Sequence, residues 1–249
     1  MLALITGGTS GIGKDIAINL SNKGYDLILV SRSENDLEYI KSKCNTKVEF
    51  ISLDLTIESN CYKLLDMTKD LDIDIFINNA GFGDIGYIDK TDIKKEVNIV
   101  KVNDIALLIL GKEFLKRFIL KDRGHVMFVA SAASFGVAPY MNVYYASKAF
   151  VYSLSHGYYR ELKDRKSNVK IHVLCPGPVD TRFNEKANTK FNMHALSSVY
   201  VANYAVKKMF KNKFEIVPGF NIKLLHFFSH FVPKKLISAL MRKQSQIGN

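Results

Sequence analysis

Short apolar segments recur along this chain, and each is followed by a longer segment with apolar residues at helical spacing. Strands that alternate with helices pair in parallel, because each helix carries the chain back across the sheet. The alternation therefore predicts an α/β fold with a doubly wound parallel sheet of about seven strands and helices on both faces. The predicted strands are LALIT at 2–6, DLILVS at 26–31, VEFISL at 48–53, DIFIN at 74–78, HVMFVAS at 125–131, KIHVLCP at 170–176 and FEIVPG at 214–219.

Two of the intervening helices can be delimited. Residues 12–23 carry apolar side chains four apart and are followed by Gly24, which can adopt the left-handed conformation that ends a helix. Residues 142–165 predict a longer helix. The chain has no internal repeat, low-complexity tract or linker, so residues 1–249 are predicted to form a single domain.

The cysteines and the N-terminus bear on the cellular compartment. Cys44, Cys61 and Cys175 are odd in number and form no CxxC pair, which supports neither a disulfide framework nor a thiolate metal site. The opening MLALITGG has no basic region and is too short for a signal peptide. We therefore expect a cytoplasmic protein without a metal site.

The net charge of +11 is concentrated near the C-terminus. From Ala187 onward the sequence contains ten lysines and arginines and one acid, Glu215, which gives this part of the chain a net charge of +9. These cations alternate with an apolar stripe and follow no nucleic-acid-binding motif. A solvated basic face is favoured over nucleic-acid binding.

The first strand runs into TGGTSGIG at 6–13. Glycines in a strand-to-helix turn let backbone N–H groups approach a pyrophosphate, and we assign Gly7, Gly11 and Gly13 to this task. Residues 8–14 also fit the start of a P-loop, but Asp15 stands where that motif needs Ser or Thr and would repel a triphosphate. A dinucleotide loop is favoured over the P-loop and over a glycine turn without a ligand.

The end of the second strand bears on the choice of cofactor. A carboxylate there binds the ribose hydroxyl of NAD, whereas a cation suits the additional phosphate of NADP. Ser31 and Arg32 occupy this turn, and the first acid is Glu34. Arg32 can fork onto a phosphate, so NADP(H) is predicted over NAD(H); the alternative is that Arg32 is only a surface cation.

Tyr-x-x-x-Lys occurs four times, so the spacing alone does not identify a site. Only the pair Tyr144/Lys148 has a serine, Ser131, thirteen residues before the tyrosine at the end of a predicted strand. Ligand crevices form at the carboxyl ends of parallel strands, which singles out this pair. Its neighbour Tyr145 has Ala149 at the position of the lysine.

These segments together resemble the short-chain dehydrogenase/reductase family. TGGTSGIG, NNAG at 78–81, Ser131, YYASK at 144–148 and PGPVDT at 176–181 match in order and spacing over roughly the first three quarters of the chain. The resemblance implies a Rossmann fold, a nicotinamide cofactor and catalysis at C=O or CH–OH groups.

The resemblance also implies individual roles. Asp54 would meet the adenine, residues 79–81 the nicotinamide ribose, and residues 176–181 would close over the nicotinamide. Lys148 would also bind the ribose, and Asn103 would position a water that relays a proton to it. The set expected to bind the cofactor is Gly7, Thr9, Ser10, Gly11, Ile12, Gly13, Ser31, Arg32, Asp54, Leu55, Asn79, Ala80, Gly81, Tyr144, Lys148, Pro176, Gly177, Val179 and Thr181.

Residue chemistry gives the expected mechanism. Hydride reduction of a carbonyl leaves negative charge on oxygen, so the site must supply a proton there. Tyr144 is the predicted acid, with Lys148 making it more acidic and Ser131 orienting the carbonyl oxygen. The predicted catalytic set is Asn103, Ser131, Tyr144 and Lys148.

The substrate side is predicted to be mostly apolar. Residues 181–200 are a polar stretch with scattered aromatic residues and are predicted to form a lid. The residues predicted to line the substrate pocket are Phe82, Ala133, Phe135, Tyr140, Met141 and Phe183.

Residues 220–249 predict an amphipathic helical extension. Its apolar stripe is interrupted at Pro233. Three roles stay open: covering the pocket or a subunit contact, peripheral membrane contact, or binding a protein partner. The stripe consists of Leu224, Phe227, Phe228 and Phe231, and then Leu236, Ile237 and Leu240.

The sequence thus favours an NADPH-dependent reductase of a medium-to-large apolar ketone or aldehyde. One alternative is a reductase of 3-oxoacyl thioesters of coenzyme A or acyl carrier protein. An alternative of another class is a catalytically silent NADPH-binding sensor or scaffold. The family resemblance also implies a homodimer or homotetramer.

Overall fold

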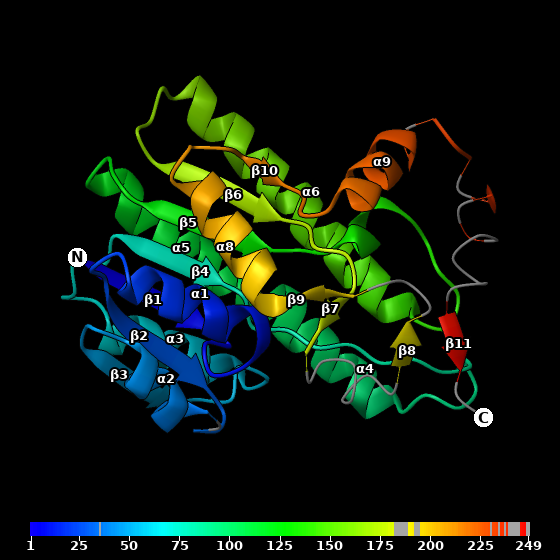
Figure 1. Ribbon diagram of the computed structural model, residues 1–249, viewed down its shortest axis with the longest axis horizontal. Helices are drawn as coiled ribbons and strands as arrows, with labels where there is room; N and C mark the ends of the chain where they lie inside the picture. Colours follow the sequence, from blue (N-terminus) through cyan, green and yellow to red (C-terminus); the bar gives the residue numbers. More distant parts are fainter. Residues whose placement is uncertain are drawn as a thin grey trace.

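The predicted strands form one parallel sheet (Figure 1). The computed structural model describes residues 1–34, 36–181, 189–191, 195–229, 231–233, 235–236, 238 and 245–247. The sheet has the order β10-β6-β5-β4-β1-β2-β3, with every neighbouring pair parallel, which confirms the doubly wound fold. The strands are β1 Leu2–Thr6, β2 Asp26–Ser31, β3 Val48–Ser52, β4 Ile75–Asn78, β5 His125–Val129, β6 Lys170–Leu174 and β10 Glu215–Ile216.

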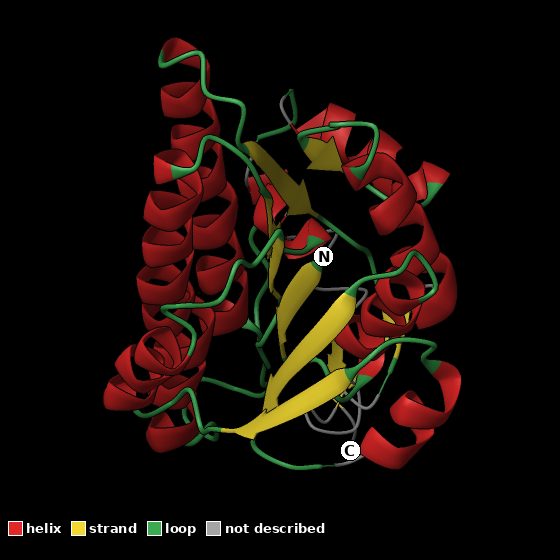
Figure 2. Ribbon diagram, turned by 90° about the vertical axis from the view of Figure 1, so that its left-hand side faces the viewer, coloured by secondary structure: helices red, strands yellow, loops and turns green. Residues whose placement is uncertain are grey.

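Helices cover both faces of the sheet (Figure 2). Ile5 and Leu29 point into one apolar layer, whereas Leu4 and Phe76 point into the other, because successive strand residues face opposite sides. Coverage of both faces explains why the strands read as continuous apolar runs. The first layer is closed by α1 Gly11–Ser21, α2 Leu37–Lys43 and α8 Ser198–Met209, and the second by α3 Glu58–Met67, α5 Leu107–Leu120 and α6 Asn142–Asp164.

The ends of the predicted helices follow local chemistry. Helix α1 ends at Ser21, two residues before the predicted end, and Gly24 with φ +86° then turns the chain into β2. Helix α6 matches its prediction to within one residue. Helix α4 (Ile93–Val100) continues through a π-helical turn, η1 (Lys101–Ala106), directly into α5.

The C-terminal segment is helical only in part. Helix α9 (Phe220–Ser229) lies within the predicted extension, but Ser245–Ile247 forms a strand, β11, paired antiparallel with β8 (Thr189–Phe191). A wholly helical extension is therefore wrong, because backbone pairing with β8 draws this segment into an extended conformation. Phe183, Ile237, Leu240 and most of the predicted lid lie outside the described residues.

The apolar stripe of α9 faces solvent rather than the core. Phe227 is 59% and Phe228 50% exposed, and Leu224 and Phe231 are exposed as well. Two short strands, β7 (Val179–Asp180) and β9 (Leu196–Ser197), pair with each other in parallel. Among the helices that the structure describes, none has the length and apolar character needed to cross a bilayer.

His172 is predicted to make the stability of this fold depend on pH. Its ring is fully buried, with Nδ1 donating to the Lys213 carbonyl (2.7 Å) and Nε2 accepting from His125 Nδ1 (3.0 Å). Burial lowers the pKa of His172 to about 4. The unfolded chain binds this proton at higher pH than the folded chain, so the free energy of unfolding falls as pH drops from about 6.5 towards 4.

Urea unfolding at pH 6.5 and pH 4.5 tests this prediction. We expect the wild type to lose on the order of 2 kcal/mol more than His172→Gln, which keeps a donor but does not titrate. Equal losses in the two proteins would contradict it.

Candidate active site

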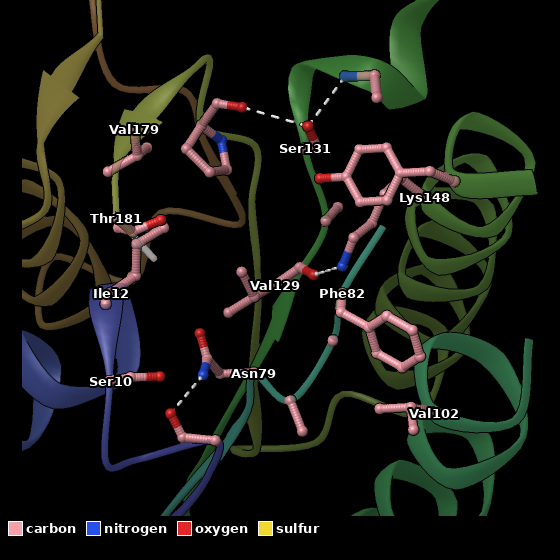
Figure 3. A pocket seen from close by; sticks show the side chains of 18 of the residues that line it. Ser10, Ile12, Asn79, Phe82, Val102, Val129, Ser131, Lys148, Val179 and Thr181 are labelled. Carbon is pink, nitrogen blue, oxygen red and sulfur yellow. Dashed lines mark hydrogen bonds between the residues drawn. The ribbon is translucent and has the colours of Figure 1, made fainter. Parts of the chain in front are cut away.

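The carboxyl ends of the strands open into one cavity of about 660 Å³ (Figure 3). Loops after β1 to β6 line it, together with residues of α4, α6 and α9. This is the edge at which ligands bind in doubly wound sheets, and the volume suits a cofactor or a small-molecule substrate.

The turn from β1 into α1 leaves no room for side chains at Gly7 and Gly13. A Cβ on Gly13 would lie 2.3 Å from the Gly7 carbonyl oxygen, and one on Gly7 would lie 2.8 Å from Asn79 Nδ2. Gly7 and Gly11 also have positive φ, of +64° and +52°, and Gly11 faces the methyl group of Thr181. A bare backbone turn at a helix N-terminus fits the diphosphate of a dinucleotide.

Hydrogen bonds from the end of β4 brace this loop. Asn79 Nδ2 donates to the carbonyl oxygens of Thr6 (2.9 Å) and Gly7 (3.1 Å). In return, Thr6 Oγ1 accepts from the backbone N–H groups of Asn79 and Ala80. Asn79 therefore holds the glycine loop while it lines the floor of the cavity (Figure 3).

Ser131 lies two residues after the end of β5 and is the N-cap of the 3₁₀ turn η2 (Ala132–Phe135). Its Oγ accepts from the Ala133 N–H (3.1 Å) and donates to the Pro176 carbonyl (3.5 Å), as Figure 3 shows. The hydroxyl also lines the cavity. Ser131 is thus both the cap of a turn and a polar group available to a ligand.

Tyr144 and Lys148 lie one turn apart at the start of α6, with Lys148 Nζ 5.8 Å from the centroid of the tyrosine ring. Burial raises the pKa of Tyr144 to about 12, and its hydrogen bond with Ser131 opposes part of this shift. The sequence predicted a more acidic phenol under the influence of Lys148. Burial sets the direction of the shift in the pKa of Tyr144, so the phenol is protonated at neutral pH.

Lys148 extends into the interior beneath the cavity, where Nζ donates to the Val129 carbonyl (3.0 Å; Figure 3). Burial lowers the pKa of Lys148 to about 8, and the Asp104 carboxylate acts in the opposite direction. Burial raises the pKa of Asp104 to about 6. At pH 7 the ammonium is therefore mostly charged, with a carboxylate behind it.

Asn103 lies behind the cavity, fully buried in the π-helical turn η1. Its Nδ2 donates to the Phe82 carbonyl (3.0 Å) and Ser147 Oγ (2.9 Å), and its Oδ1 accepts from the Phe82 N–H (3.1 Å). A Cβ on Gly81 would lie 2.9 Å from Asn103 Oδ1 and 3.3 Å from Lys148 Nζ. Asn103 thus fixes the chain that passes beside the lysine.

Comparison with known proteins identifies the family. The family model described as short chain dehydrogenase matches residues 1–192. The chain is a short-chain dehydrogenase. It therefore belongs to a family of oxidoreductases.

Relatives of this short-chain dehydrogenase include proteins with and without a named activity. An uncharacterized oxidoreductase of Staphylococcus epidermidis is 31% identical over 186 residues, which covers 74% of this chain and 80% of that protein. The very-long-chain 3-oxoacyl-CoA reductase of Bos taurus is 30% identical over 192 residues, which covers 72% of this chain and 60% of that protein.

Solved structures share the fold over most of the chain. A short-chain dehydrogenase from Sphingobium yanoikuyae in complex with NADPH superposes with a TM-score of 0.82 at 25% identity, covering 88% of each chain. A short-chain dehydrogenase/reductase from Burkholderia phymatum in complex with NAD gives a TM-score of 0.82 at 21% identity, covering 100% of this chain and 96% of that one. The second similarity shows the fold alone.

The cavity of this short-chain dehydrogenase brings together most of the predicted site residues. All of the catalytic set except Asn103 line it. The lining residues that the sequence predicted are Gly7, Ser10, Gly11, Ile12, Ser31, Arg32, Asp54, Leu55, Asn79, Ala80, Gly81, Phe82, Ser131, Ala133, Met141, Tyr144, Lys148, Pro176, Gly177, Val179 and Thr181.

Four further predicted residues do not line the cavity of the dehydrogenase. Thr9 is buried, with Oγ1 donating to the Ser33 carbonyl (3.3 Å), and Gly13 packs against the glycine loop itself. Phe135 packs behind the cavity, and Tyr140, with φ +70°, stacks edge-on with Tyr87. These residues support the walls of the cavity rather than facing a ligand.

Other lining residues were missed from the sequence. Lys94 and Lys95 contribute from α4, and Ile222 and Leu225 from α9. Tyr145 also lines the cavity beside Tyr144. The helical stripe of the C-terminal segment was visible in the sequence, but nothing there indicated which face would meet the cavity.

Proposed function

We propose that this short-chain dehydrogenase is an NADPH-dependent reductase of a ketone or aldehyde with a medium-to-large apolar substituent. One observation supports it above all: the bare glycine loop and the pair Ser131 and Tyr144 open into the same cavity. The first is suited to hold a dinucleotide and the second to protonate a carbonyl oxygen.

The chain's own residues would hold the cofactor at three places. The glycine loop would take the diphosphate, Asp54 would lie at the adenine, and Lys148 would bond the nicotinamide ribose. A Cβ at Gly7 or Gly13 would clash with this loop. The glycines at these positions therefore fit a loop that holds the diphosphate of a dinucleotide. When bound, the reduced nicotinamide supplies the hydride for the carbonyl carbon.

Ser131 and Tyr144 would act on the carbonyl oxygen. The Ser131 hydroxyl would turn its proton from the Pro176 carbonyl to the substrate oxygen, where the hydrogen bond would orient the oxygen and stabilise the charge that develops on it. The phenol of Tyr144 is protonated at neutral pH, as a proton donor has to be. The ammonium of Lys148 would stabilise the tyrosinate that remains after the proton has left.

Asp104→Asn is predicted to move the pH profile. If the Lys148 ammonium is needed, kcat/KM for reduction falls as pH rises through about 8, the pKa of Lys148. The Asp104 carboxylate raises that pKa, so Asp104→Asn lowers the pKa of Lys148 and shifts the alkaline limb of the profile to lower pH. Asp66→Asn, at an exposed helix position, is the control, and coincident alkaline limbs in all three proteins would contradict the prediction.

Arg32→Ala is predicted to weaken binding of NADPH selectively. Ser31 and Arg32 line the cavity after β2, where they would meet the additional phosphate of NADP. We expect Kd for NADPH to rise about 10- to 100-fold with Kd for NADH nearly unchanged, since charge-assisted bonds to the phosphate are lost. Arg160→Ala, at an exposed position of α6, is the control; equal losses for both cofactors would contradict the NADP preference.

The cavity favours an apolar substrate, with Phe82, Met141 and Val179 among its lining residues. A second candidate is a 3-oxoacyl thioester of coenzyme A or acyl carrier protein. The Bos taurus relative supports it, and Lys94 and Lys95 at the cavity could attract phosphate groups.

A panel assay of NADPH oxidation with bulky ketones, aldehydes and 3-oxoacyl thioesters tests the proposal. We expect turnover with bulky ketones and little with acetone. Turnover confined to thioesters would favour the second candidate. Binding of NADPH without turnover of any compound would favour a sensor and contradict the proposed activity.

We also propose that the protein is a cytoplasmic homodimer or homotetramer. Helix α4 and the turn η1 expose apolar side chains in successive turns, at Ile93, Val97, Val100 and Ile105. Such a face is suited to pair with a second copy. Size-exclusion chromatography with light scattering gives the mass, and a monomer at micromolar concentration would contradict the proposal.

The C-terminal segment supports a proposal of peripheral membrane contact. Phe227 and Phe228 on α9 are exposed. The part of the chain from Ala187 onward, which contains them, carries a net charge of +9. An apolar stripe among cations is suited to an anionic lipid surface. Co-sedimentation with anionic vesicles should fall in Phe227→Ser/Phe228→Ser, and equal recovery of both proteins in the supernatant would count against it.

A further inference from the structure

Helix α9 forms one wall of the cavity, with Ile222 and Leu225 lining it. Ile222 lies against the turn after β6, where its Cδ1 is 2.6 Å from the position that a Cβ on Gly177 would occupy. Gly177 therefore allows α9 to approach the cavity closely. The position of α9 sets the space that remains for a substrate.

Apolar burial holds α9 only weakly. Within the described helix α9, Ile222 is the one buried side chain, at 5% exposure. Phe227 and Phe228 face solvent instead. A helix with so little buried apolar surface needs other contacts to stay in one position.

Those contacts come from a polar cluster of three residues on three elements: Tyr152 on α6, Glu215 on β10 and His226 on α9. The Tyr152 hydroxyl donates to Glu215 Oε1 (3.2 Å) and lies 3.3 Å from His226 Nε2. His226 Nε2 is also 3.2 Å from Glu215 Oε1. One carboxylate oxygen thus joins the helix to the sheet and to α6.

Aromatic packing connects the same cluster to the turn η2. The ring of Phe135 stacks on His226, with centroids 4.1 Å apart, and meets Tyr152 edge-on at 5.4 Å. Phe135 ends the turn that Ser131 begins. A shift of His226 would therefore disturb the element that carries Ser131.

The cluster also lies next to the proposed acid and its lysine. Tyr152 follows Lys148 by one helical turn on α6. Ser134 Oγ donates to the Lys148 carbonyl (2.7 Å), which ties η2 to the same turn of α6. The cluster thus contacts α6 and η2, which carry Tyr144 and Ser131, as well as α9.

The charge of Glu215 and the burial of Tyr152 favour the hydrogen bond between them. Glu215 is the one acid of the sequence from Ala187 onward, and it lies at this point rather than among the surrounding lysines. Burial, followed by the Glu215 charge, raises the pKa of Tyr152, so the phenol stays neutral and donates to the carboxylate. Among the residues that the structure describes, the titratable side chains near the cluster include His156, Cys175 and Lys148.

We propose that Tyr152, Glu215 and His226 are positioning residues for the substrate: they hold α9 so that Ile222 and Leu225 press a bulky apolar group towards Ser131 and Tyr144. The residues do not touch the reacting atoms. The expected effect on KM rests on the proposed reductase activity. The expected effect on hydrogen exchange in α9 does not depend on that activity.

Tyr152→Phe is the decisive variant, because it removes one hydroxyl and keeps the ring that packs on Phe135. We expect KM for a bulky ketone to rise about tenfold, with kcat within about twofold and Kd for NADPH unchanged. Amide hydrogen exchange across residues 220–229, measured without substrate, should become about tenfold faster while the exchange of 142–164 stays as in the wild type.

Controls separate this role from general packing. Tyr159→Phe, two turns further along α6 and stacked on Phe214, should leave both readouts unchanged. Glu215→Gln retains an acceptor for the Tyr152 hydroxyl, so its KM should rise less than that of Glu215→Ala.

Two outcomes overturn the proposal. One is hydrogen exchange in α9 of Tyr152→Phe equal to that of the wild type and Tyr159→Phe. The other is faster exchange with unchanged KM, which would reduce the cluster to a stabilising contact. If the wild type reduces no carbonyl compound, the proposed activity fails. The comparison of hydrogen exchange between the variants still tests whether the cluster fixes the position of α9.

Discussion

Tyr144→Phe is expected to lower kcat for ketone reduction by about 10³-fold, within the 10²–10⁴ range that general acid catalysis contributes. The substitution removes the hydroxyl that would protonate the carbonyl oxygen and keeps the ring in the wall of the cavity. Kd for NADPH, measured by fluorescence titration, should change by less than about threefold, because the glycine loop and Arg32 are untouched.

Tyr145→Phe is the matched control. Tyr145 adjoins Tyr144 in sequence, also lines the cavity and is also raised in pKa by burial. Four residues after Tyr145 stands Ala149, whereas four residues after Tyr144 stands Lys148. We expect kcat within about threefold of the wild type. Equal losses in the two variants, or full activity of Tyr144→Phe, would remove Tyr144 from the mechanism.

Gly13→Ala is expected to abolish cofactor binding, with Kd for NADPH raised by at least about 100-fold. Its Cβ would lie 2.3 Å from the Gly7 carbonyl oxygen and 2.5 Å from Asn79 Nδ2. Neither contact can be relieved without moving the loop or the asparagine that braces it. Isothermal titration of NADPH measures the loss, and circular dichroism shows whether the sheet has persisted.

Gly157→Ala separates this effect from the general cost of replacing a glycine. Gly157 lies within α6, and a Cβ there meets nothing within 4 Å. Because Ala favours a helix over Gly, we expect NADPH affinity to be unchanged and unfolding free energy to rise by up to about 1 kcal/mol. Wild-type affinity in Gly13→Ala would show that the loop is not the cofactor cradle.

The sheet could be predicted from the sequence because its strands are buried on both faces. A continuous apolar run such as DLILVS is typical of a strand that is buried on both faces. All seven predicted runs are strands of one sheet in the structure. The glycine loop, Ser131 and Tyr144 were predictable for a related reason, since topology brings the ends of parallel strands to one edge.

What could not be predicted depends on tertiary packing. The π-helical turn η1, which turns the Asn103 amide towards the Phe82 backbone, was not visible in the sequence, and the catalytic role of Asn103 stays a prediction. The sequence also predicted an acidic phenol for Tyr144. In the structure burial raises the pKa of this phenol, and the extent of burial is not visible from the spacing of residues. The contact of Ile222 with Gly177 joins residues 45 positions apart (222 − 177), which no local pattern reports.

Transfer of deuterium from the reduced nicotinamide to a bulky ketone tests the central claim most directly. The protein is incubated with NADPH deuterated at C4, each face in turn, and the alcohol is analysed by mass spectrometry and NMR. The account predicts one deuterium on the carbinol carbon from one face only, and none when Tyr144→Phe replaces the wild type over the same time. Alcohol formed without deuterium from either face, or NADPH bound with no alcohol formed from any carbonyl compound, would contradict it.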